Sequence, residues 1–100
     1  MPRFTAGSRL DDNQPELVRQ LRAIGASVTS TAGVGDGFPD ICVGWRGQNY
    51  LLEIKDPKKI PSRRKLTPDE KEWHDRWGGQ VAVVETFEDC LQVLGVTRPA

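Results

Sequence analysis

Two short apolar runs, separated by only four residues, constrain the fold of this chain most. The runs extend from Asp40 to Trp45 and from Tyr50 to Lys55, and Arg46-Gly47-Gln48-Asn49 joins them. Such a pattern, with a glycine in the connection, is typical of a β-hairpin. A hairpin pairs the two runs side by side. It would therefore bring Asp40, at the start of the first run, close to Glu53 near the end of the second.

Side chains alternate across a strand, which divides the second run into two faces. Leu52 and Ile54 share the face that can be buried, whereas Glu53 and Lys55 share the opposite one. The hairpin is therefore expected to present a carboxylate and an ammonium group together, beside the carboxylate of Asp40.

The segment before the hairpin predicts a helix, a strand and a loop. Apolar residues repeat at helical spacing from Leu17 to Ile24, and Gly25 is a typical residue to end the helix. Asn13 is the expected N-cap, with Glu16 completing a capping box. Residues 26–31 predict a strand, and the glycine-rich residues 33–37 predict a loop.

The segment after the hairpin predicts helix, strand and helix. Residues 56–66 form a basic loop. Thr67 then opens a helix, with Glu70 completing a capping box, and this helix ends at Gly78-Gly79. Residues 80–84 are expected to form a buried strand. Thr86 opens a final helix with the same capping-box pattern through Asp89, and this helix ends at Gly95.

The element order is thus α-β-β-β-α-β-α, which predicts a central mixed β-sheet flanked by helices. Residues 1–100 are expected to form a single α/β domain, with an irregular lead-in over 1–11 and a tail over 96–100.

Several classes of protein are disfavoured. The two cysteines, Cys42 and Cys90, belong to no CxxC or Cys/His cluster, so neither structural zinc nor a disulfide scaffold is expected. No stretch has membrane-spanning length, and the first residues lack the apolar core of a signal peptide. A cytoplasmic location is therefore expected.

Asp40, Glu53 and Lys55 suggest hydrolysis of a phosphodiester. Oxygen ligands from two carboxylates can hold Mg²⁺, which polarises a phosphoryl oxygen and activates a bound water. Lys55 would then act as a base or as a stabiliser of charge, and the sequence does not separate these roles. The alternative is that Glu53 and Lys55 form an ordinary solvated ion pair.

Five basic residues follow this strand closely: Lys58, Lys59, Arg63, Arg64 and Lys65. Their position favours contacts to a nucleic-acid backbone, although the chain as a whole carries no net charge. A solvated loop without a ligand is the alternative.

The sequence also resembles a family. Gly37-Phe38-Pro39-Asp40 followed by Leu52-Glu53-Ile54-Lys55 is similar to the motif of the PD-(D/E)xK nucleases. The closer resemblance is to small stand-alone VRR-NUC and Holliday-junction-resolvase-like nucleases of phages, and it extends over roughly residues 10 to 95.

This resemblance implies a restriction-endonuclease-like fold and one or two Mg²⁺ or Mn²⁺ ions, with Asp40, Glu53 and Ile54 as metal ligands. It further implies DNA cleavage that leaves a 5′-phosphate, and a homodimer in members that resolve four-way junctions. If the chain is encoded by a phage, the host cytoplasm is the expected location.

One position departs from the family pattern. Related resolvases carry a glutamate on the first helix, where this chain has Gln14. A glutamine offers a carbonyl oxygen but no charge, so Gln14 is either a weaker contributor to the catalytic site or a plain first-turn residue. Glu16 would replace the missing glutamate only if the helix were rotated.

The aromatic residues have competing interpretations. His74 is expected to be a hydrogen-bonded packing residue and not a catalytic one. Trp73 and Trp77 lie four apart on one helix face, which predicts a place in the core or in a dimer interface. Trp45 would stack on a base or pack against a partner. The 33–37 loop lacks the Gly-Lys-Ser/Thr ending of a P-loop, and either admits the substrate or simply forms a turn.

Three functions follow from these observations. The first is a structure-selective endonuclease that cuts branched, four-way-junction DNA as a homodimer. The second is a general or nicking nuclease of linear or single-stranded DNA, and the third is a non-catalytic DNA-binding module on the same fold. For a nuclease, activity should fall in acid, because Asp40 and Glu53 must be ionised to bind the metal.

Overall fold

The fold is seen in a computed structural model that describes residues 11–97. The elements run in the order α2 (Gln14–Ala23), β1 (Ser27–Ser30), β2 (Ile41–Trp45), β3 (Gln48–Ile54), the 3₁₀ helix η1 (Pro61–Arg63), α3 (Pro68–Arg76), β4 (Ala82–Val84) and α4 (Phe87–Leu94). Apart from η1, this is the predicted order. The lead-in over residues 1–10 and the tail over residues 98–100 lie outside the described residues.

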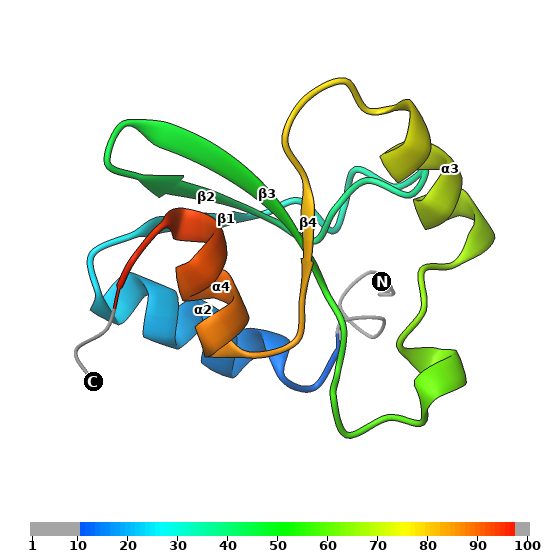
Figure 1. Ribbon diagram of the computed structural model, residues 1–100, viewed down its shortest axis with the longest axis horizontal. Helices are drawn as coiled ribbons and strands as arrows, with labels where there is room; N and C mark the ends of the chain where they lie inside the picture. Colours follow the sequence, from blue (N-terminus) through cyan, green and yellow to red (C-terminus); the bar gives the residue numbers. More distant parts are fainter. Residues whose placement is uncertain (1–10, 98–100) are drawn as a thin grey trace.

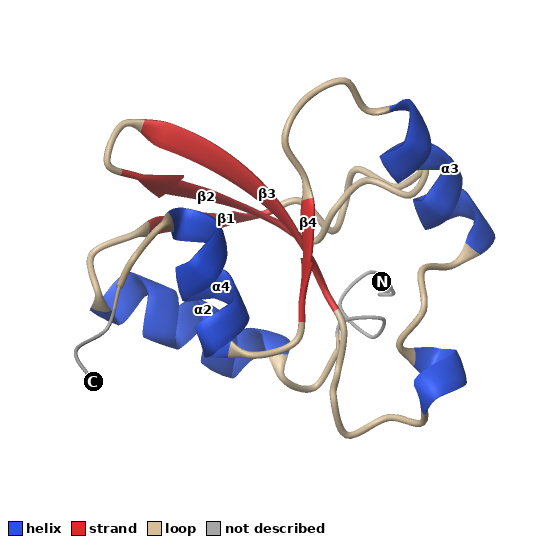
Figure 2. Ribbon diagram, viewed as in Figure 1, coloured by secondary structure: helices blue, strands red, loops and turns tan. Residues whose placement is uncertain are grey.

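The four strands form one mixed sheet in the order β1-β2-β3-β4, as Figure 2 shows. β1, β2 and β3 pair antiparallel, and β4 pairs parallel to β3. A parallel pair needs a crossover connection, which residues 55–81 with α3 supply. The predicted α/β fold with a central mixed sheet is confirmed.

The β2–β3 hairpin is tighter than the sequence suggested. Arg46 and Gly47 have φ values of 50° and 81°, and β3 begins at the next residue, Gln48. Positive φ at both central residues is the requirement of a type I′ turn, whose twist matches that of the strands. The expected four-residue connection is therefore wrong, and Gln48 and Asn49 belong to the ladder.

The core lies on one face of the sheet. Ile41, Val43, Leu52 and Ile54 point to this face and are almost completely buried. In Figure 1, α2 and α4 lie together against the sheet, while α3 stands apart from them at the far end of β3 and β4. The helices contribute Leu17, Leu21, Cys90 and Leu94 to the same core.

β4 is not the fully buried strand that residues 80–84 predicted. Val84 is 1% exposed, but Val83 is 44% exposed and Ala82 only half-buried. β4 is an edge strand, and its outer face has no helix packed on it among the described residues. The apolar run over residues 80–84 therefore predicted more burial than β4 has.

The predicted capping boxes of the second and third helices are confirmed. Thr67 and Glu70 cap α3 reciprocally, and Thr86 and Asp89 cap α4 in the same way. Gly25 and Gly95 follow α2 and α4 with positive φ, as residues that end helices often do.

The capping box predicted for α2 is wrong. Asn13 has helical backbone angles and makes no side-chain cap. Its Nδ2 instead donates to the carbonyl oxygens of Lys55 and Glu85, at 3.1 and 3.0 Å. Glu16 is exposed and pairs with Arg19. Asn13 therefore ties the start of α2 to the ends of β3 and β4, a contact that no local pattern reveals.

We expect Asn13→Ala to lower the free energy of unfolding by about 1–3 kcal/mol, because it leaves two part-buried carbonyl groups without their donor. Chemical denaturation of the two proteins measures the difference. Asp12→Ala changes the exposed neighbour and should cost no more than about 0.5 kcal/mol. Equal losses in both variants would contradict the assigned role of Asn13.

Both cysteines are free, with Cys90 in the core and Cys42 half-buried, in keeping with the expectation of no disulfide. Among the described residues, no helix is long and apolar enough to span a membrane.

Candidate active site

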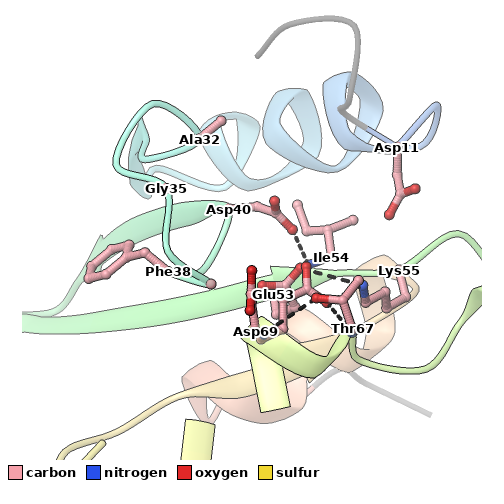
Figure 3. Close-up of a pocket in the computed structure, with 12 residues that line it drawn as sticks. Asp11, Ala32, Gly35, Phe38, Asp40, Glu53, Ile54, Lys55, Thr67 and Asp69 are labelled. Atoms are coloured by element: carbon pink, nitrogen blue, oxygen red, sulfur yellow. Dashed lines mark hydrogen bonds and ion pairs between the residues drawn. The ribbon is translucent and has the colours of Figure 1, made fainter. Parts of the chain in front are cut away.

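A pocket of about 370 Å³ opens between the ends of β2 and β3, the 32–40 loop and the first turn of α3. Figure 3 shows the acidic and basic side chains that meet there. Those that carry its charge are Asp11, Asp40, Glu53, Lys55, Asp69 and Glu70. The pocket thus contains the three residues singled out in the sequence, together with three further carboxylates.

Asp40 is held in place by the hairpin register and by the loop before it. Ile41 pairs with Leu52, and the Asp40 N–H donates to the Leu52 carbonyl at 3.1 Å. Asp40 therefore lies opposite Glu53, as predicted. Its Oδ2 accepts a 2.7 Å hydrogen bond from the Ile54 N–H, beyond the last pair of the ladder. Burial raises the pKa of Asp40, while this backbone hydrogen bond acts in the opposite direction.

Glu53 is a buried carboxylate with an unsatisfied oxygen. The residue is 2% exposed, and its Oε1 has no hydrogen-bond partner. Burial, together with the neighbouring carboxylates of Asp40 and Glu70, raises the pKa of Glu53 to about 10. A carboxylate in this position needs a nearby positive charge in order to stay ionised.

Lys55 supplies part of that charge. Its Nζ is 2.7 Å from Glu70 Oε1 and 3.7 Å from Glu53 Oε2. Burial alone would lower the pKa of Lys55, but the hydrogen bond and charge of Glu70, with the charge of Glu53, raise it. The alternative of a solvated Glu53–Lys55 pair is wrong, because both side chains are less than a tenth exposed.

The donor set fits a divalent cation that keeps much of its own water. Within residues 11–97, no three His, Cys, Asp or Glu side chains are grouped so as to hold a metal ion by themselves. Asp40 and Glu53 nevertheless form a close carboxylate pair, and Glu53 Oε1 has no hydrogen-bond partner among the described residues. Mg²⁺ binds through one or two carboxylates, with waters and substrate phosphates completing its shell. The third expected ligand, Ile54, lines the same pocket.

Gln14 is buried in the first turn of α2 but does not line the pocket. Its Oε1 has no hydrogen-bond partner, which leaves a buried acceptor in need of a donor. The structure therefore does not place Gln14 in the lining of the pocket, and a direct role remains a prediction. The exposed Glu16 does not replace it.

The five basic residues do not form one free cluster. Lys59 pairs with Asp11 at 3.2 Å, and Arg64 with Glu85 at 3.7 Å. These two pairs attach the 56–66 segment to the start of α2 and to the end of β4. Lys58, Arg63 and Lys65 are exposed, and none of the five lines the pocket.

The tryptophans of α3 are not core residues. No residue of α3 is buried, and Trp77 is 42% exposed. Trp73 and Trp77 stack with ring centroids 4.5 Å apart, and the Phe38 ring meets Trp73 edge-on at 5.1 Å. The aromatic residues therefore join α3 to the loop before Asp40. The prediction of a core position is wrong, and a dimer interface remains a prediction.

The 33–37 loop approaches α3 closely at one glycine. Gly37 has a φ of 83°, and a Cβ added there would lie 2.4 Å from the Asp69 carbonyl oxygen. Only a glycine allows this backbone contact. The loop is therefore more than a simple turn, because it lines the pocket and the backbone at the start of α3 packs against it.

His74 and Trp45 lie outside the pocket. His74 packs edge-on against Trp73 as expected, but its buried Nε2 has no hydrogen-bond partner, so the predicted hydrogen bond is absent from the described contacts. Burial lowers the pKa of His74. Trp45 packs against the core, with Arg46 4.9 Å above its ring.

Glu70 was missed by the sequence interpretation, which used it only as a capping residue. Asp11 and Asp69, which also line the pocket, were assigned no role from the sequence. No local sequence pattern shows that this capping glutamate also reaches the buried Lys55, because the two residues are fifteen apart in the crossover connection.

Comparisons with known proteins give one informative likeness. No protein-family model and no curated protein matches the chain. The structure is similar to a solved VRR_NUC domain, with a TM-score of 0.57 and 26% sequence identity over 92% of this chain and 97% of the other. This likeness supports the VRR-NUC resemblance of the sequence and the restriction-endonuclease-like fold. It indicates a nuclease-type domain.

Proposed function

We propose that this chain is a metal-dependent endonuclease that hydrolyses DNA phosphodiester bonds in the pocket around Asp40, Glu53 and Lys55. The observation that carries the proposal is the buried Glu53 carboxylate, whose Oε1 has no partner and which faces Asp40. Ionisation of the buried Glu53 beside the half-buried Asp40 is unfavourable unless a cation joins the two carboxylates. In a nuclease-type domain, such a cation would be the metal ion used for phosphodiester hydrolysis.

Each residue of the pocket has a distinct role in this proposal. Asp40 and Glu53 hold Mg²⁺ or Mn²⁺, and Ile54 offers its backbone at the same place. A bound metal ion supplies Lewis-acid polarisation of the phosphoryl oxygen and a more acidic water. Lys55 lies between two carboxylates that favour its ammonium form, so we assign it to charge stabilisation and not to proton abstraction.

The exposed side chains of Lys58, Arg63 and Lys65 are the proposed contacts to the DNA backbone. Such contacts place the substrate without reading its sequence. Lys59 and Arg64 would contribute only if the DNA displaced Asp11 or Glu85 from their ion pairs. We further propose branched, four-way-junction DNA as the preferred substrate and a homodimer as the active form, both on the resemblance alone.

The test is cleavage of a labelled four-way junction beside a matched linear duplex, in Mg²⁺ and in EDTA. Lys55→Ala is expected to cut about a hundredfold to a thousandfold more slowly than the parent, since it removes the positive charge next to the reacting phosphate. Lys71→Ala is the matched control, because Lys71 is an exposed lysine of α3 whose described ion-pair partner is Asp75.

The outcomes separate the candidate functions. Metal-dependent cutting of the junction alone supports a junction-selective nuclease, and equal cutting of the duplex supports a general one. Binding of DNA without metal-dependent cutting of either substrate contradicts the proposal and favours a non-catalytic binding module.

A further inference from the structure

The tip of Lys55 is bound to α3 and not only to its own strand. The shortest contact of its Nζ is the 2.7 Å hydrogen bond to Glu70 Oε1, whereas Glu53, near the end of β3, is 1 Å more distant at 3.7 Å. A hydrogen bond between two charged groups in a part-buried site is among the stronger side-chain interactions.

Glu70 is itself fixed by the start of α3. The oxygen that accepts from Lys55 also accepts from the Thr67 N–H at 2.8 Å, and the Glu70 N–H donates to Thr67 Oγ1 at 3.2 Å. The positive end of the helix dipole further favours the ionised carboxylate. The place of this oxygen, and with it the place of the ammonium, is therefore set by where α3 begins.

Few other contacts hold α3 in position. None of its residues is buried, and long connections join it to β3 and β4 (Figure 1). Its other described contacts to the body of the domain include Glu70 near Glu53, the rings of Trp73 and Trp77 against Phe38, and the Asp69 carbonyl over Gly37. The Glu70–Lys55 pair is thus a main link between α3 and the sheet.

We propose that Glu70 is a positioning residue for Lys55, and that its ion pair couples the docked position of α3 to the orientation of the ammonium in the pocket. The effect on cleavage rests on the proposed function, but the coupling itself does not. Without Glu70, the described ion-pair partner left to the long lysine side chain is the more distant Glu53, and the side chain can turn out of the pocket.

A capping role alone would predict a different behaviour, and α4 provides the comparison. Asp89 closes the same kind of capping box with Thr86 but has no lysine partner among its described contacts. Glu70→Gln keeps a side-chain oxygen for the Thr67 N–H and removes the charge that attracts Lys55. Asp89→Asn makes the same change in the other box, and Thr67→Val removes the hydroxyl cap of α3 while keeping Glu70.

The first measurement is the rate at which an amine-reactive ester modifies each lysine in EDTA without DNA, followed by mass spectrometry. Lys58 and Lys65 are exposed internal references. In the parent, Lys55 should react much more slowly than either. Glu70→Gln should raise the Lys55 rate about tenfold or more, the change expected when a charged hydrogen bond is lost. Glu70→Asp, which keeps the charge but has a shorter reach, should give an intermediate rate.

Asp89→Asn and Thr67→Val should leave the Lys55 rate unchanged. An unchanged Lys55 rate in Glu70→Gln, or an equal rise in Thr67→Val, would overturn the proposal. The second measurement is cleavage, where Glu70→Gln should lower kcat about tenfold with little change in KM, because orientation acts on the reacting complex. If the parent cuts no DNA but the modification rates follow the prediction, the proposed function fails and the coupling of Glu70 to Lys55 stands.

Discussion

Asp40→Asn is expected to reduce metal-dependent DNA cleavage about a thousandfold or more while the fold is retained. In the parent, the Ile54 N–H donates to Asp40 Oδ2 at 2.7 Å. Asparagine keeps the size of the side chain and an oxygen that can accept this hydrogen bond. It loses the negative charge, which contributes one of only two proposed carboxylate ligands. Loss of a group that stabilises charge in the transition state typically costs a factor of a hundred to about a thousand, and loss of the metal ion costs more.

Initial rates at saturating DNA and a series of Mg²⁺ concentrations measure this effect. Asp36→Asn is the matched control, since Asp36 is exposed in the same loop and its positive φ of 56° suits asparagine. Circular dichroism and the melting temperature show whether each variant is folded. Cleavage at the parental rate by a folded Asp40→Asn protein would contradict the assignment of the metal site.

Glu53→Gln should abolish cleavage and, at the same time, stabilise the metal-free protein. The buried carboxyl group of Glu53 has a pKa of about 10, because burial and two neighbouring carboxylates disfavour its charge. At neutral pH the folded protein therefore keeps this group protonated, at a free-energy cost relative to the ionised group of the unfolded chain, and a neutral amide of the same shape removes that cost. A gain of about 1–3 kcal/mol is expected, within the range for a buried polar group that lacks full compensation. In a domain of this size, each kcal/mol raises Tm by about 4–8 °C.

The same residue predicts how the stability of the metal-free protein depends on pH. An unfolded chain releases the Glu53 proton near the ordinary value of 4.5, and the folded chain holds it until about pH 10. Between these values the folded state binds more protons than the unfolded state, so the free energy of unfolding falls as the pH rises. The stabilising contribution is complete below about pH 4.5 and is lost by about pH 10.

Thermal denaturation in EDTA at several pH values measures this dependence. The decline should be much smaller in Glu53→Gln, and Mg²⁺ should raise the Tm of the parent by binding the folded state. Glu72→Gln provides the control, because Glu72 is an exposed residue of α3 whose only described partner is Arg76 at 4.0 Å. Equal pH profiles for the parent and Glu53→Gln would show that Glu53 is ionised without the metal.

Much of the fold was predictable because it depends on local chemistry. The reciprocal caps at Thr67 and Thr86 and the terminating glycines 25 and 95 are short-range devices whose residue types carry the signal. The hairpin was predictable for the same reason, and its period of two placed Leu52 and Ile54 in the core and Glu53 and Lys55 on the other face.

The failures share a physical cause, which is competition from distant partners. Asn13 has the type and place of an N-cap, yet its amide binds the backbone of Lys55 and Glu85. The apolar run at 80–84 predicted a buried strand, but Val83 is exposed because β4 lies at the sheet edge. Neither the identity of a tertiary hydrogen-bond partner nor the position of a strand in a sheet is encoded in a local pattern.

The candidate site likewise has features that the local sequence predicts and features that depend on tertiary contacts. The sequence by itself determined the α/β order and predicted that Asp40 lies near Glu53 and Lys55, because strand alternation and a short connection bring these side chains together, whereas the register was set by the two-residue turn of the structure. Only the tertiary structure decided that the Glu53–Lys55 pair is buried, that two of the five basic side chains are held in ion pairs, and that Glu70 reaches Lys55. Burial and charge pairing depend on which distant segment packs against a strand. Here that segment is the start of α3, which lies within the long crossover connection between β3 and β4.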